Sequence, residues 1–250
     1  MKDGENTYKL DHTEIRESIS RLCSNFSGEY WRKCDLDQQY PAEFVEELTK
    51  AGFLSCLIPE EYEGSGLPLS AAAAILEEIH RSGGNAAACH AQIYTMGTLL
   101  RHGSETQKKD YLPAVARGEL RLQAFGVTEP SSGTDTSSLR TFARRVGDNY
   151  VVSGQKIWTS RSQYSDLMIL LCRTQARQEV AKKTDGLSVL LVDMRNINTE
   201  QMTIKPIKTM MNHATTEIFF DEMEVPASNL IGEEGKGFKY ILSGMNAERI

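Results

Sequence analysis

The sequence predicts an α+β protein, in which an all-helical N-terminal domain precedes an antiparallel β domain, a sandwich or barrel, and a last helix begins a C-terminal helical bundle. Hydrophobic residues recur every three or four positions up to about residue 121, as on one face of a helix. Short β-rich runs between turn residues follow. Helical spacing then returns and continues to Ile250 without a stop signal, which indicates a truncated helix. We therefore expect domains at 1–121, 122–232 and 233–250.

About five helices are expected in the first domain. The first is indicated by apolar residues at helical spacing: Ile15, Ile19, Leu22 and Phe26. Asp11 and Glu14 form a possible capping box in front of it. A second helix is predicted from Pro41 to Gly52, because proline is favoured in the first turn and glycine just after the last.

The rest of the first domain is also predicted to be helical. The alanine-rich stretch 70–101 suggests two helices, separated at Gly83-Gly84. Ser104 and Gln107 form a second capping-box pattern, which opens a helix ending near Gly118.

The β domain is predicted from five apolar runs: FGV, NYVVSG, LMILLCR, LSVLLVD and IFF. A Gly-Asp-Asn turn at residues 147–149 joins two strands as a hairpin. No helical pattern of usual length separates most of these runs. An antiparallel sheet is therefore expected rather than a doubly wound one.

The composition excludes several classes of function. With 250 residues, of which 40% are hydrophobic and 25% charged, the chain is typical of a globular protein. A net charge of -6 argues against nucleic acid and anionic lipid as partners. No run is long enough for a membrane span and no secretory signal opens the chain, which predicts a cytoplasmic protein. Five scattered cysteines and five histidines without paired spacing predict neither a disulfide framework nor a metal site.

The loop with the clearest chemical potential is FGVTEPSSGTDTSS, at residues 125–138. Hydroxyls and backbone N–H groups could hold a phosphate here, and Gly133 would let the backbone approach it closely. The same composition is typical of a polar surface turn, which composition alone favours.

The order of residues in this loop resembles the signature of the acyl-CoA dehydrogenase family. The matching pieces are Gly126-Val127-Thr128-Glu129 and Ser132-Gly133-Thr134-Asp135, although Ser132 and Thr134 replace other small residues that are common there. The resemblance implies that the loop lies over FAD. Phe125, Val127 and Thr128 would then contact the isoalloxazine ring, and Gly133 and Thr134 the pyrophosphate. Thr134 would also contact the pantetheine of an acyl-CoA.

A second segment, GQKIWTSRS at residues 154–162, resembles the strand behind the flavin in the same family. The resemblance makes Trp158, Thr159 and Ser160 cofactor-binding residues, with Trp158 shielding one ring face and Ser160 bonding near its N5 edge. A core tryptophan is the alternative. Weaker similarity at IPEEYEGSGL, HGSETQKKDYLP and FFDEMEVPASNLIGEEGKG extends the resemblance over nearly the whole chain.

The last helix carries the third candidate site. A face through Phe238, Leu242 and Met245 continues onto Arg249, which predicts an arginine on the buried side that faces an anion. The resemblance implies that Asn246 and Arg249 hold the CoA chain. It also makes Glu248 a candidate catalytic base, although the base could lie in a domain absent from this sequence. A solvated surface ion pair is the alternative for Glu248.

The helix around residue 94 is expected to set the acyl length. The family resemblance points to its residues His90, Gln92, Tyr94, Met96 and Leu99. Packing in an apolar core is the alternative for the last three, and a satisfied polar group is the alternative for His90.

The resemblance implies an FAD-dependent α,β-dehydrogenation of an acyl-CoA to a trans-2-enoyl-CoA. Electrons would leave for an electron-transfer flavoprotein or a similar acceptor, and the protein would be a homo-oligomer, a dimer or tetramer. An acyl-CoA oxidase, a non-enzymatic flavoprotein of the same fold and a fold relic without cofactor are the alternatives.

Overall fold

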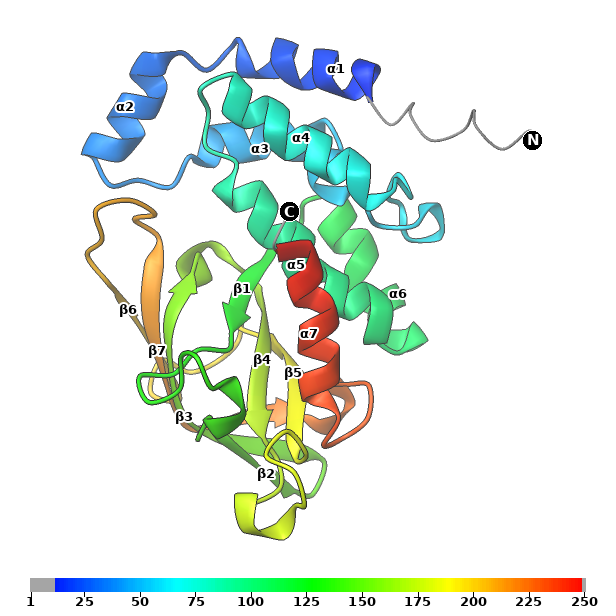
Figure 1. Ribbon diagram of the computed structural model, residues 1–250, viewed down its shortest axis with the longest axis vertical. Helices are drawn as coiled ribbons and strands as arrows, with labels where there is room; N and C mark the ends of the chain where they lie inside the picture. The colour runs from blue at the N-terminus through cyan, green and yellow to red at the C-terminus, as the bar shows by residue number, and fades with distance from the viewer. Residues whose placement is uncertain (1–11, 249–250) are drawn as a thin grey trace, which may run out of the picture.

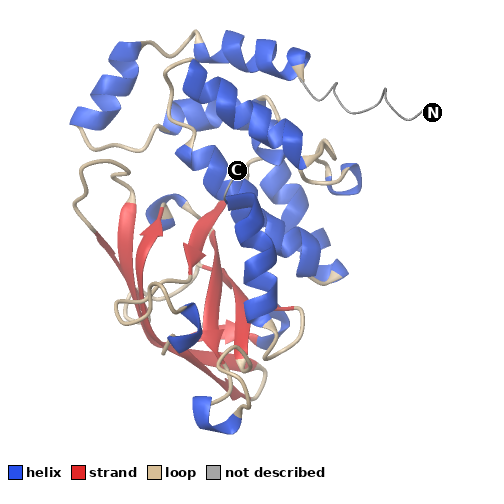
Figure 2. Cartoon of the chain, in the orientation of Figure 1, coloured by secondary structure: helices blue, strands red, loops and turns tan. Residues whose placement is uncertain are grey.

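A layer of helices lies at one end of the molecule and a β-sheet at the other, with α5 (Ala87–His102) and α7 (Gly237–Glu248) at the junction (Figures 1 and 2). The computed structural model describes residues 12–248, with side chains through residue 245. Within these residues, no helix is both long and apolar enough to cross a membrane.

Six α-helices form the first layer: α1 (Thr13–Cys23), α2 (Gly28–Leu36), α3 (Ala42–Lys50), α4 (Leu69–Arg81), α5 (Ala87–His102) and α6 (Glu105–Ala116). The sequence predicted about five and missed α2. No residue of that helix is fully buried, and its contact with the core is made by Tyr30 and Trp31, two adjacent residues that form no helical repeat. Short 3₁₀ turns lie at Phe53–Ser55, Glu60–Tyr62, Thr136–Ser138, Ser162–Tyr164, Arg177–Glu179 and Ala227–Asn229.

Local signals placed most helix ends. The capping box of Ser104 and Gln107 is present at α6. Gly52 follows α3 with φ 77°, a left-handed conformation that favours glycine. At α1 the structure differs, because His12 is the N-cap and makes no side-chain capping bond. The predicted cap, Asp11, lies outside the described residues.

The second layer is one sheet with eight strands: β1 (Leu122–Gly126), β2 (Phe142–Val146), β3 (Asn149–Ser160), β4 (Leu167–Arg173), β5 (Leu187–Asp193), β6 (Met202–Pro206), β7 (Thr215–Pro226) and β8 (Leu230–Ile231). Their order is β6-β7-β3-β2-β4-β5-β8, and β1 pairs with β4.

Most of these pairings are antiparallel, as predicted, and the β2–β3 hairpin is confirmed. The sheet is nevertheless mixed, because β1 runs parallel to β4 and β2 touches β4 in parallel at one pair. The β2–β3 hairpin lies between β1 and β4 in the sequence, and after it β4 runs in the same direction as β1. A turn pattern in the sequence predicts the hairpin, but no local signal predicts that β4 will pair with β1 in parallel.

Strand β4 lies at the centre of the core, with every residue buried. Leu167, Ile169 and Leu171 face the cluster that includes residues of α5, α6 and α7. Met168, Leu170 and Cys172 face the second cluster, on the other side of the sheet. The sheet is therefore covered on both faces at this strand, which explains its unbroken apolar run.

Helix α7 (Gly237–Glu248) packs along α5 (Figure 1). The predicted buried face is confirmed at Phe238 and Met245, which pack against the core, but is wrong at Leu242, which is 47% exposed. Tyr240 and Ile241 are buried instead. Helix α7 approaches α5 closely at Gly244, where a Cβ atom would lie 2.6 Å from Oγ1 of Thr98. A glycine adds nothing to an apolar pattern, so the sequence did not show that this side of α7 meets α5.

Candidate cofactor and substrate site

A cleft of about 440 Å³ lies where the helical layer meets the sheet. Its lining residues are Tyr94, Phe125, Val127, Thr128, Gly133, Thr134, Thr136, Ile157, Trp158, Ser160 and Met245. Every predicted FAD contact except Thr159 is among them. The two motifs meet directly, because the N–H of Ile157 donates to the carbonyl of Thr128 at 2.9 Å.

Trp158 reaches the cleft through a β-bulge in β3. Lys156 pairs with Ile218 and Thr159 with Thr216, so that two residues of β3 oppose one of β7. Trp158 takes φ 62° and is 57% exposed. This backbone conformation costs a bulky residue about 1–3 kcal/mol of folding free energy, so it persists only where the surrounding structure enforces it. Bulges often turn a side chain toward a functional site.

Thr159 is turned away from the cleft. Its side chain is 1% exposed and its hydroxyl has no hydrogen-bond partner among the described residues. Side chains alternate between the two faces of a strand, so Trp158 and Ser160 face the cleft while Thr159 points into the protein. The geometry therefore gives no support to the predicted cofactor contact by the Thr159 side chain.

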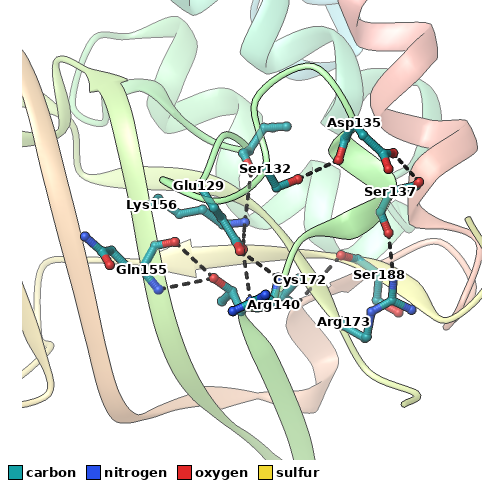
Figure 3. A network of polar contacts seen from close by, with 12 residues as sticks. Glu129, Ser132, Asp135, Ser137, Arg140, Gln155, Lys156, Cys172, Arg173 and Ser188 are labelled. Atoms are coloured by element: carbon teal, nitrogen blue, oxygen red, sulfur yellow. Dashed lines mark hydrogen bonds and ion pairs between the residues drawn. The ribbon is translucent and has the colours of Figure 1, made fainter. Parts of the chain in front are cut away.

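A buried ion pair fixes the two motifs to each other (Figure 3). Nζ of Lys156 lies 2.8 Å from Oε1 of Glu129 and 3.0 Å from the carbonyl oxygen of Val127. The Glu129 carboxylate also accepts the backbone N–H groups of Arg140 and Thr141, at 2.6 and 2.9 Å. This pair was not predicted from the sequence, although Glu129 and Lys156 lie in the two family motifs.

The charge of Glu129 is stabilised in spite of burial. Burial acts to raise the pKa of this carboxyl, but the Lys156 charge and the hydrogen bonds to Thr141 and Arg140 outweigh it and hold the pKa below the ordinary value. Burial lowers the pKa of Lys156, and Glu129 opposes that effect. The pair thus closes the loop after β1 onto β3.

Hydrogen bonds within the 129–138 loop give it a fixed shape. Oγ of Ser132 donates to the carbonyl of Asp135 at 2.6 Å. Ser137 and Ser138 donate to the Asp135 carboxylate, which lowers the pKa of Asp135 to about 2. A Cβ atom added at Gly133 would meet nothing within 4 Å, so the backbone of the loop is open toward the cleft.

Ser160 presents a hydroxyl to the cleft. Its Oγ accepts a hydrogen bond from Nδ2 of Asn212 at 2.9 Å. The O–H of Ser160 has no acceptor among the residues that the structure describes, so it remains available as a donor toward a ligand.

A basic cavity of about 440 Å³, which was not predicted from the sequence, lies beside the Asp135 loop. Its lining includes Arg140, Arg173, Arg177 and Lys183 but no acidic residue. These cations come from three separate segments, so no run of basic residues marked the site. Such a cavity suits a phosphorylated ligand.

The residues of α5, the helix expected to set the acyl length, lie in different environments. Tyr94 lines the cleft, and its ring meets that of Phe125 edge-on at 5.3 Å. Met96 and Leu99 are fully buried in the core, which is the packing alternative. Gln92 is also buried, and its Nε2 donates to the carbonyl of Leu54 at 3.3 Å.

The other candidates of this helix and of the last one lie elsewhere. His90 lines a different cavity, of about 740 Å³, next to Met211. The side chains of Asn246 and Glu248 lie outside the described part of the chain, as does Arg249. No group of three or more His, Cys, Asp or Glu residues suited to a metal ion occurs among the described residues.

An aromatic-lined cleft with hydroxyl and backbone donors, between a helical layer and a sheet, has the features of a site for a planar cofactor. Family models match the chain over most of its length: "Acyl-CoA dehydrogenase, N-terminal domain" at residues 9–119 and "Acyl-CoA dehydrogenase, middle domain" at residues 124–223. The chain therefore belongs to the acyl-CoA dehydrogenase family.

Individual relatives agree with this assignment. The chain is 35% identical to acyl-CoA dehydrogenase FadE26 of Mycobacterium tuberculosis, over 95% of this chain and 56% of the relative. It is similar to glutaryl-coenzyme A dehydrogenase in its glutaryl-CoA complex, with a TM-score of 0.86, 26% identity, and 99% and 62% of the two chains covered. It is also similar to the ChsE4-ChsE5 complex of Mycobacterium tuberculosis, with a TM-score of 0.82 and 29% identity, over 98% of this chain and 62% of the chain in the complex. The chain thus spans less than two thirds of the length of these relatives.

Proposed function

We propose that this chain provides the FAD-binding cleft of an enzyme that dehydrogenates an acyl-CoA between its α and β carbons. The observation that carries the proposal is the strained, exposed Trp158, which faces a cleft shared with Thr128 and Gly133. An exposed indole in a costly backbone conformation is expected where a ligand covers it.

The residues of the cleft fit the flavin in separate ways. Trp158 would cover one face of the isoalloxazine ring, while Phe125, Val127 and Thr128 would contact it from β1 and the following loop. Gly133 and Thr134 would hold the pyrophosphate through the open backbone of the loop. Ser160 would donate its free O–H to the N5 edge of the ring.

The reaction needs a base, a dry cleft and an acceptor for a hydride. Glu248 is our candidate for the base that removes the α-proton of the thioester. Exclusion of water by Tyr94 and Phe125 would strengthen this carboxylate as a base. FAD, when bound, accepts the hydride from the β-carbon, so that the product is a trans-2-enoyl-CoA.

The CoA portion would extend away from the flavin. Thr134 would contact the pantetheine, and Asn246 and Arg249 would hold the CoA chain from α7. The basic cavity next to the Asp135 loop supports a place for the CoA phosphates, since among the described residues only Lys183 of its four cations has a carboxylate within ion-pair distance, that of Asp135 at 3.4 Å.

The proposal extends to partners and location. Electrons would pass to an electron-transfer flavoprotein or a similar acceptor, and the protein would assemble as a dimer or tetramer. We place it in the cytoplasm, where the free cysteines of the chain would stay reduced.

Anaerobic mixing of the full-length protein with acyl-CoAs of graded length tests the function. We expect a yellow protein that bleaches with its substrate and regains colour with an electron-transfer flavoprotein faster than with air. Faster reoxidation in air would indicate an oxidase. A yellow protein that no acyl-CoA bleaches, or a colourless one, would contradict the proposal.

The role of Arg249 has its own test. We expect Arg249→Ala to raise KM for CoA esters while the flavin content stays unchanged, because the guanidinium would bind the CoA chain and not the cofactor. An unchanged KM would remove Arg249 from the site.

A further inference from the structure

Arg161 is a buried cation that has no carboxylate partner within the described part of the chain. The residue is only 7% exposed, and no Asp or Glu of the described chain lies within ion-pair distance of its guanidinium. The one side-chain hydrogen bond it makes there joins Nη2 to Oδ1 of Asn212, at 3.1 Å. A guanidinium has five N–H donors, so most of its bonding capacity is unused.

The ionisable groups of the described chain that act on Arg161 are Tyr94, Tyr40 and Cys89, and none of them is a carboxyl. Burial raises the pKa of Tyr40 and raises that of Cys89 to about 12, so both are neutral near pH 7. Burial also lowers the pKa of Arg161 itself, which reflects the cost of an uncompensated charge.

Arg161 lines a cavity of about 240 Å³ between the N-terminal end of α5, the segment 31–41 and the loop before β7. The one acidic residue of this lining, Asp35, has a side chain that is 70% exposed and bonds to Nε2 of His213 at 2.8 Å. The carboxylate therefore lies toward solvent, and the buried part of the cavity keeps its positive charge. A cavity of this size holds a small ionised group with a few methylenes.

The cavity adjoins the cofactor cleft. Asn212 connects the two, because its Nδ2 donates to Ser160 of the cleft while its Oδ1 accepts from Arg161. The Arg161 backbone is itself left-handed, with φ 62°, and its N–H donates to the carbonyl of Ala214 at 2.6 Å. At this strained turn Ser160 therefore lines the cofactor cleft while Arg161 lines the neighbouring cavity.

We propose that the Arg161 cavity binds a carboxylate, and that this carboxylate is the distal group of the acyl chain of the CoA ester. The second part rests on the proposed dehydrogenase function. A carboxylate suits the site because it is ionised at pH 7 and accepts two parallel N–H bonds from one guanidinium. A free dicarboxylic acid offers the same chemistry, and the experiment separates the two sources.

The first arm uses the full-length protein, with Arg161→Met and Arg161→Lys as variants. Dicarboxylyl-CoAs are compared with plain acyl-CoAs of equal carbon number, such as adipoyl-CoA with hexanoyl-CoA. At the fitting length, Arg161→Met is expected to lower kcat/KM for the carboxylated ester roughly 10- to 100-fold and to leave the plain ester within about threefold. Arg161→Lys should recover part of the loss, because lysine keeps the positive charge but lacks the two parallel N–H donors of the guanidinium.

The second arm measures thermal shifts without any CoA ester, so it does not depend on the dehydrogenase function. Adipate is expected to raise the Tm of the wild type but not that of Arg161→Met, and dimethyl adipate should raise neither. If adipate acts and the esters do not differ, attachment to the acyl chain is overturned while the carboxylate site stands.

Two results would overturn the proposal as a whole. One is that neither carboxylated esters nor free dicarboxylates distinguish the wild type from Arg161→Met. The other is a drop in Tm of the ligand-free variant with equal losses for both esters, which would show a structural role. Removal of an unpaired buried charge should instead leave the ligand-free Tm unchanged or higher.

Discussion

Lys156 and Trp158 lie two residues apart in β3 and have opposite environments. Lys156 is fully buried and paired with Glu129, whereas Trp158 is 57% exposed in the cleft. In a regular strand, residues at this spacing face the same side. The bulge between them breaks the alternation. One short segment therefore both holds the loop after β1 and presents an aromatic ring to a ligand.

The largest effect is expected from the buried pair. Glu129→Gln leaves the Lys156 charge without its partner, and we expect the free energy of unfolding to fall by about 3–5 kcal/mol. Urea denaturation of the apoprotein measures this change. The double variant Glu129→Gln, Lys156→Met is the matched control and should recover most of the loss, since no buried charge remains.

A loss below about 1 kcal/mol for Glu129→Gln alone would show that the pair does not hold the loop. Equal losses for the single and double variants would assign the effect to the hydrogen bonds of Arg140 and Thr141 instead.

Acid should remove the contribution of the same carboxylate. The folded state lowers the pKa of Glu129 below its ordinary value of 4.5. A lowered carboxyl pKa contributes stability that is full above the unfolded pKa and is lost as the pH falls through the folded pKa. The free energy of unfolding of the wild type minus that of the double variant should therefore be constant from neutral pH to about pH 5 and fall below pH 4.5, because only the wild type has this carboxylate to protonate. Denaturant melts across this range measure the two free energies, and a wild type that gains stability relative to the double variant in acid would contradict the assignment.

Trp158 should affect ligand binding more than stability. We expect Trp158→Ala to weaken FAD binding by about 10- to 100-fold, the loss of one stacked ring, and to change the stability of the apoprotein by less than about 1 kcal/mol. Flavin titration and denaturant melts measure the two effects. Trp158→Phe, which keeps a ring, is the control. A destabilisation of about 3 kcal/mol or more would make Trp158 a core residue.

The smallest effect is expected at Thr159, next to Trp158. Its buried hydroxyl has no partner among the described residues. Thr159→Val keeps the shape and removes that unsatisfied group, so we expect unchanged flavin content and a gain of up to about 1 kcal/mol. Reduced flavin affinity would restore Thr159 to the cofactor site.

The sequence by itself determined the local features and the motifs. Apolar spacing, the capping box at Ser104 and the turn near residue 148 depend on neighbours along the chain, so helices and the hairpin were predictable. The order of residues 126–135 and of 154–162 likewise pointed to one site, and the cleft contains both segments.

Only the tertiary structure decided what depends on distant partners. The parallel course of β1, the face that α7 buries and the inward turn of Thr159 follow from strand order, close packing at Gly244 and the bulge opposite β7. The Glu129–Lys156 pair, and the position of Arg161 away from every carboxylate that the structure describes, both depend on burial. Burial arises when separate segments exclude water together, and no local pattern of residues records which segments will meet.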